Sequence, residues 1–114
     1  MIGAGIHLYP PITSGGDSLL ICTNRESTSE KGDALALFSI SSDGAVRPAE
    51  TPFYWGVGRH IRGLGGNGRF VVAAGRDEGG VVVLERTGDG SVLAEVARID
   101  IPGVVVPLWM DKRE

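Results

Sequence analysis

The sequence has one cysteine, no long apolar run and no excess of positive charge, and each shortage narrows the possible functions. Cys22 lies in the apolar run Leu19–Cys22 and has no second thiol to pair with, so a reducing, cytoplasmic compartment is expected. No apolar stretch approaches the ~20 residues of a membrane-spanning helix, and the first residues lack a basic leader. The formal net charge of −3 provides no basic stripe, so neither a membrane nor nucleic acid is an expected partner.

Motifs that hold cofactors are missing as well. The chain contains no phosphate-binding loop, no dinucleotide-binding fingerprint and no nucleophile elbow. No group of Cys, His and Asp has the spacing of metal ligands. We therefore expect a protein that works without a metal or a cofactor.

Glycine is the residue in excess, with 18 among 114 residues and no three-residue period. The glycines separate short runs of β-branched and aliphatic residues, which is where an all-β chain needs turns. No segment keeps apolar residues at helical spacing for ten residues. The expected strands are Gly5–Tyr9, Leu19–Thr23, Ala34–Ser41, Ala45–Glu50, Arg59–Leu64, Arg69–Ala74, Gly79–Thr87 and Ser91–Asp100.

The two halves of the chain repeat one pattern. Leu19–Arg25 matches Phe70–Arg76 51 positions further along, and the turn Asp43-Gly44 recurs 46 positions later as Asp89-Gly90. The difference is a longer loop, Glu26–Asp33, in the first copy. A four-stranded unit of about 45–50 residues is typical of a β-propeller blade. A β-sandwich or a small barrel is the alternative, although neither requires this repeat.

The predicted architecture is therefore all-β, with about two four-stranded antiparallel blades of a β-propeller. Blade one covers 1–50, blade two covers 51–100, and 101–114 form a closing strand and tail. Because two blades cannot close a ring, we expect the chain to be a fragment whose missing blades complete the ring. Truncation is favoured over assembly of several chains, and the chain alone is expected to be inactive and prone to associate.

Hairpin geometry brings charged residues together at one end of each innermost pair of strands. A turn near Asn67-Gly68 places His60 opposite Arg76, and a turn at Gly15-Gly16 places His7 opposite Arg25. In a propeller the loops at this end open onto the mouth of the central channel. Each blade is thus predicted to present one histidine and one arginine to that channel.

Asp77 and Arg62 add to this group, because Asp77 follows the second strand and Arg62 shares one side of its strand with His60. Arginine suits a carboxylate or phosphate, and histidine exchanges a proton near neutral pH. We predict catalytic roles for His60 and Arg76 and substrate-binding roles for Arg25, Arg62, His7 and Asp77. In the structural alternative, His60 caps a strand and the arginines tie neighbouring blades through Glu26 or Asp77.

The segments Arg59–Leu64 and Gly66–Asp77, with Ile6–Leu8 and Leu20–Arg25 in the earlier copy, resemble the seven-bladed lactonase family. That family includes bacterial 6-phosphogluconolactonase and fungal carboxy-cis,cis-muconate cyclase. The resemblance implies the C-terminal part of a cytoplasmic, metal-free enzyme that hydrolyses an anionic lactone or runs a muconate-type cyclisation. The alternative is a non-catalytic propeller that serves as a scaffold or binding module.

Overall fold

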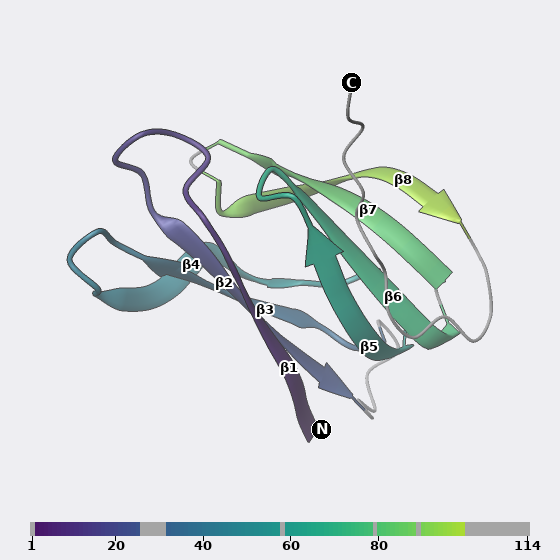
Figure 1. Cartoon of the computed structure of the whole chain (residues 1–114). Coiled ribbons are helices and arrows are strands. Elements are labelled where there is room, and N and C mark those ends of the chain that lie inside the picture. The colour runs from purple at the N-terminus through teal and green to yellow at the C-terminus, as the bar shows by residue number, and fades with distance from the viewer. Residues whose placement is uncertain (1, 26–31, 58, 79, 89, 100–114) are drawn as a thin grey trace.

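Two antiparallel sheets of four strands each make up the described part of the protein (Figure 1). The computed structural model describes residues 2–25, 32–57, 59–78, 80–88 and 90–99, and gives only the backbone of 2–4, 24, 25, 59, 60, 62 and 76–78. The strands are β1 (Ile2–Tyr9), β2 (Ser18–Arg25), β3 (Leu35–Ile40), β4 (Val46–Tyr54), β5 (Arg59–Gly66), β6 (Phe70–Glu78), β7 (Gly80–Thr87) and β8 (Val92–Ile99). These residues include no helix, and therefore none that could cross a membrane, so the all-β prediction is confirmed for them.

Each sheet is a simple meander, in which every strand pairs with its neighbour in sequence. The predicted turn between β3 and β4 forms as expected from its residues. Gly44 has a φ of 89°, and the Asp43 carboxylate accepts a 3.2 Å hydrogen bond from the amide of Ala45 and another from the Ser41 hydroxyl. An aspartate that satisfies the turn amides itself, followed by a glycine with positive φ, fixes a tight reversal.

The strand β4 runs further than the sequence indicates, since it continues from Val46 to Tyr54 rather than ending at Glu50. The expected border between the two units, after residue 50, therefore falls inside β4. The strand contains Pro48 and Pro52, and β4 lies at the edge of its sheet. Proline is tolerated on an edge strand because one side of that strand needs no hydrogen-bonding partner.

The core lies between the two sheets, which form two layers. The layers stack with like strands together, since β1 and β2 approach β5 while β4 approaches β8. The core side chains alternate along the central strands, as expected where one face of a strand is buried. They include Leu19 and Ile21 of β2, Leu35 and Leu37 of β3, Val71 and Ala73 of β6, and Val82 and Leu84 of β7.

The repeat seen in the sequence is present in the pairing of the strands. Ile21 pairs with Leu37 in the first sheet, and the residues 51 and 46 positions later, Val72 and Val83, pair with each other in the second. Equivalent side chains of the two sheets nevertheless do not share the core. Ile21 and Leu37 belong to the core between the sheets, whereas Val72 and Val83 do not.

The second sheet therefore contributes the opposite face of its unit to the core. We call the sides of the two sheets that point at each other the inner faces, and the sides that point away the outer faces. The residues on the inner face of β5–β8 are equivalent to residues on the outer face of β1–β4. The two units thus meet through two different faces of the repeated unit, an arrangement that we call head to tail.

Candidate functional site

The second sheet brings together the backbone positions that the sequence predicts for catalysis. Arg59 pairs with Glu78 and Ile61 pairs with Gly75, with an irregularity between the two pairs. His60 therefore stands across from residues 76 and 77 of β6. The backbone register matches the predicted neighbourhood of His60, Arg76 and Asp77, whose side chains lie outside the described residues. Arg62 follows two positions later on β5, again with only its backbone described.

The first sheet does not repeat that arrangement, and the predicted pairing of His7 with Arg25 is wrong. His7 pairs with Ile21, and Arg25 pairs with Ile2 at the far end of β1. His7 and Ile2 are five residues apart on one strand, which separates them by about 16 Å. The reason is the turn, which closes earlier than the two glycines suggest, because the amide of Gly16 donates to the carbonyl of Thr13 at 3.0 Å.

His7 lies instead against an aromatic neighbour on the inner face of β1. Its half-buried ring is tilted by 40° against that of Tyr9, with 4.5 Å between the ring centroids. Tyr9 is 1% exposed, and its hydroxyl donates a 2.6 Å hydrogen bond to the carbonyl of Gly65 in the other sheet. Tyr9 thus joins β1 to β5, and the contact with Tyr9 gives His7 a packing role among the described residues.

A cavity of about 540 Å³ opens at the opposite end of the sheets from His60. Its walls are the loop after β1 (residues 10–13), the β5–β6 turn (67–69) and the end of β7 with the turn that follows (85–88). All three segments are connections at one end of the two sheets, which accounts for their meeting. The sequence did not single out this cavity.

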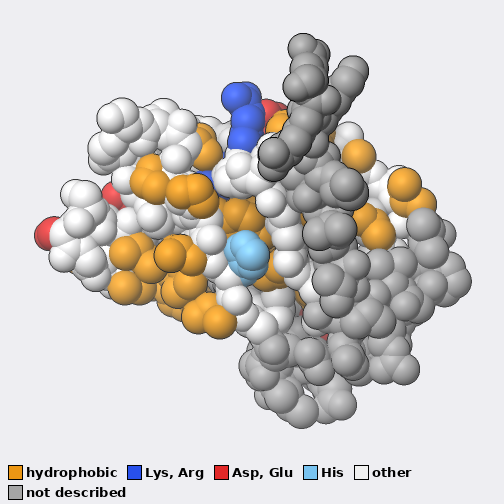
Figure 2. All heavy atoms as spheres, viewed as in Figure 1, with side chains coloured by type: hydrophobic (Ala, Val, Ile, Leu, Met, Phe, Trp, Pro, Cys, Tyr) orange, Lys and Arg blue, Asp and Glu red, His pale blue; other side chains and the backbone are white. Residues whose placement is uncertain are grey.

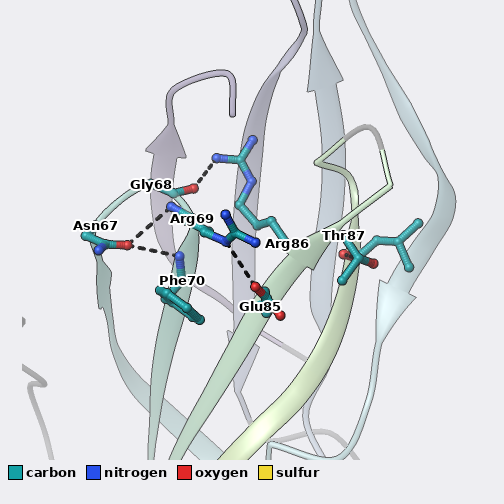
Figure 3. A network of polar contacts seen from close by, with 8 residues as sticks. Asn67, Gly68, Arg69, Phe70, Glu85, Arg86 and Thr87 are labelled. Carbon is teal, nitrogen blue, oxygen red and sulfur yellow. Dashed lines mark hydrogen bonds and ion pairs between the residues drawn. The ribbon is translucent and has the colours of Figure 1, made fainter. Parts of the chain in front are cut away.

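Arg86 lines this cavity, and it is only 2% exposed. Its guanidinium donates to the carbonyl of Gly90 at 2.9 Å, to that of Pro10 at 2.6 Å, and to that of Gly68 (Figure 3). It also lies 6.0 Å from the centre of the Tyr9 ring. One buried cation thus ties together loops from both halves of the chain, and one of its acceptors, Pro10, is 76 residues away from it in sequence.

The rim of the cavity carries an exposed ion pair and a turn held by an amide. Arg69 Nε donates to a Glu85 carboxylate oxygen at 3.0 Å, with 68% of the arginine side chain exposed (Figure 3). The Asn67 side-chain carbonyl accepts hydrogen bonds from the amides of Arg69 and Phe70 at 3.3 and 3.1 Å. In these contacts, polar groups of the rim pair with one another.

Sequence reasoning missed Arg86, although the repeat contained a signal for it. Position 86 is equivalent to position 40 in the first unit, where the residue is Ile40. A charged residue in place of an apolar one, inside an otherwise matching strand, indicates that the second unit has a polar network at that position. The partners of that network come from turns distant in sequence, so the strand alone could not identify them.

Burial raises the pKa of the Tyr9 hydroxyl well above its ordinary value, even though the positive charge of Arg86 acts in the opposite direction. Tyr9 therefore stays protonated at neutral pH as a hydrogen-bond donor to Gly65. In the part of the chain that is described, no three His, Cys, Asp or Glu side chains gather closely enough to hold a metal ion.

Comparisons of the chain with protein-family models, with curated proteins and with solved structures gave no match. The arrangement of the molecule itself therefore has to indicate its class. That arrangement comprises two like sheets stacked head to tail, a histidine–arginine segment at one end and an arginine-tied cavity at the other.

Proposed function

We propose that the two sheets are neighbouring blades of a β-propeller. The head-to-tail packing supports this, because rotation about a central axis carries each blade onto the next and always brings one face of a blade against the opposite face of its neighbour. A sandwich of two sheets related by a two-fold axis would bring equivalent faces together. The closer approach of β1 and β2 to β5 is consistent with innermost strands near an axis.

We further propose that the complete ring binds a small anionic lactone or carboxylate at the end of β5–β6 that carries His60. The observation that supports it is the register of β5 and β6, with His60 across from residues 76 and 77. An arginine there would hold the anion and stabilise the negative charge that develops on a lactone carbonyl oxygen. A histidine would accept the proton of the attacking water and return it to the leaving ring oxygen.

The resemblance to the lactonase family supplies the expected substrates. In hydrolysis, water adds to the lactone carbonyl and the ring C–O bond breaks, which gives the hydroxy acid. In the cyclisation direction, the carboxylate of a muconate adds to a double bond that receives a proton, and the arginines would hold a second carboxylate. Neither reaction needs an electron acceptor, which fits a chain without cofactor motifs.

The test is the hydrolysis of 6-phosphogluconolactone by the intact protein and by three variants. His60→Ala and Arg76→Ala are each expected to lower kcat/KM ~100-fold or more, the range for losing a general base or an oxyanion-stabilising donor. Arg69→Ala is the matched control, because Arg69 is exposed at the opposite end of the same hairpin. Equal activity of all three variants and the wild type would exclude this site.

A scaffold without catalytic activity is the second candidate, and the first sheet favours it. His7 packs on Tyr9 and pairs with Ile21, so the first unit does not present a histidine beside Arg25. A catalytic channel usually draws groups from several units, whereas a scaffold uses its rim. Binding of the phosphorylated lactone with no turnover, in wild type and in His60→Ala alike, would favour the scaffold.

A further inference from the structure

The outer face of the first sheet is apolar across all four strands. Paired residues lie on the same face of a sheet, so the pairing identifies its members. Ile6 pairs with Cys22, and Leu8 pairs with Leu20. The larger aliphatic and aromatic residues of this face are Ile6, Leu8, Leu20, Phe38, Ile40, Val46 and Phe53. We call them the outer patch.

The outer patch is open to solvent to an extent that is unusual for side chains of this size. Ile6 is 69% exposed and Leu8 56% on β1, while Val46 is 59% and Phe53 52% exposed on β4. Hydrophobic side chains gather over the sheet β1–β4 in the space-filling view (Figure 2). A contiguous apolar surface across a whole sheet marks a place where another protein surface docks.

The inner face of the second sheet shows what fits such a surface. Leu20 of the outer patch is equivalent to Val71, and Phe38 is equivalent to Leu84. Val71 and Leu84 are both fully buried against the inner face of the first sheet. The outer patch of the first sheet is therefore equivalent to the surface through which the second sheet packs on the first.

The second sheet carries the complementary surface on its outer face. Val83 is equivalent to Leu37, and Val81 is equivalent to Leu35. Leu35 and Leu37 form the inner face of the first sheet, on which the second sheet docks. On β6, Val72 and Ala74 of this face are already buried within the chain, so its open part lies on β7 and β8. There Val81 and Val83 are half-buried, and Ile99, which pairs with Val81, is 59% exposed. Each chain thus has a counterpart of both surfaces that join its own two sheets.

We propose that the outer patch is covered by the β7–β8 part of the outer face of the second sheet from a second copy of this chain, in the same head-to-tail manner as the two sheets within one chain. A contact in which one surface of a chain binds a different surface of the next copy is heterologous. Such contacts generate a ring when the rotation from each copy to the next adds up to a full turn. Propellers typically have ~4–8 blades, so two, three or four copies would complete one. This inference rests on the propeller arrangement proposed above. For the missing blades it takes the second of the two routes named from the sequence, assembly of several chains, in place of truncation.

The first test is the mass of the purified chain by light scattering and sedimentation. A discrete species with two, three or four chains is expected. A stable monomer at micromolar concentration would overturn the proposal, and so would a continuous series of larger aggregates without a closed species.

The second test distinguishes a head-to-tail ring from a dimer in which two outer patches meet. Leu8→Glu places a charge in the outer patch, and Ile99→Glu places one on the outer face of the second sheet. In a head-to-tail ring each variant alone is monomeric, but a mixture forms a heterodimer through the two intact faces. If Ile99→Glu alone still dimerises and the mixture yields no heterodimer, the patches meet each other and the proposal fails.

Both substituted residues are more than half exposed, so the variants are expected to fold, and far-UV circular dichroism checks this. Val46→Glu, at the other edge of the outer patch, replaces Leu8→Glu if that variant does not fold. Ser42→Glu is the matched control, because it adds the same charge at an exposed turn outside both faces and must leave the assembly intact. The assembly is measured as mass and the lactone site as the loss of kcat/KM in His60→Ala and Arg76→Ala. A chain that forms the ring but does not hydrolyse the lactone therefore contradicts the lactone proposal alone.

Discussion

Two arginines at the same end of the second sheet show how surroundings decide what a single side chain contributes. Arg86 is buried and donates to three main-chain carbonyls, those of Pro10, Gly68 and Gly90. Arg69 is largely exposed, and its ion pair with Glu85 is screened by water. The same residue type is therefore a structural anchor at one position and a surface group at the other.

Arg86→Met is expected to lower the free energy of unfolding by ~3 kcal/mol or more, because it leaves buried carbonyls without donors. Arg69→Met, the matched control, is expected to cost less than ~1 kcal/mol, as is usual for an exposed ion pair. Urea unfolding at one fixed protein concentration measures both. Similar losses in the two variants would mean that Arg86 does not hold the three loops together.

Tyr9 gives stability a dependence on alkaline pH. Its folded-state pKa is raised by burial, so above pH ~10 the unfolded chain releases a proton that the folded chain retains. Stability is therefore expected to fall as the pH rises past that value. Tyr9→Phe removes the titrating group as well as the bond to Gly65, so it should be less stable at pH 7 and lose less on going to pH 11. A pH series of urea unfolding checks this, and equal slopes for both proteins would contradict it.

At the scale of elements, the turns decide which predictions from sequence succeed. The β5–β6 turn is short and built by Asn67 and the adjoining glycines, so its centre is fixed and His60 falls where expected. The β1–β2 connection is longer and contains two prolines and a glycine pair. A turn could form at several positions in this connection. The turn that forms, with the amide of Gly16 bonded to the carbonyl of Thr13, shifts His7 away from Arg25.

Gly66 and Gly44 separate two costs of adding a side chain in a turn. Gly66 has a φ of 133°, and a Cβ there would lie 1.9 Å from the carbonyl oxygen of Phe70. Gly44 has a φ of 89° and nothing within 4 Å of that position. Gly44→Ala is expected to cost ~1–2 kcal/mol from backbone conformation alone, and Gly66→Ala clearly more because the backbone has to move. Thermal unfolding compares them, and an equal cost would show that the β5–β6 turn relaxes freely.

At the scale of the whole molecule, neither sheet has a core without the other. Ile21 and Leu37 of the first sheet are buried in one cluster with Ala73 and Val82 of the second. A four-stranded sheet that loses this contact exposes its apolar inner face to water, at a cost of roughly 25 cal/mol per Å². The two sheets are therefore expected to unfold as one cooperative unit.

Ile21→Ala tests this cooperativity. It is expected to destabilise the protein by ~2–5 kcal/mol, the usual range for such a core truncation. Hydrogen exchange should then show protection lost equally in β2–β3 and in β6–β7. Loss confined to the first sheet would mean that the second sheet is stable on its own.

The sequence by itself determined the all-β class, the short turns, and the repeat that pairs Ile21 with Leu37 and Val72 with Val83. These features depend on residues close together in the chain, on turn chemistry and on alternation along a strand. The tertiary structure alone decided which face of each unit enters the core, that Arg86 is buried, and that Tyr9 bonds to Gly65 of the other sheet. Those outcomes depend on contacts between distant segments, such as Arg86 with Pro10, and a local pattern carries no information about which distant segments will meet.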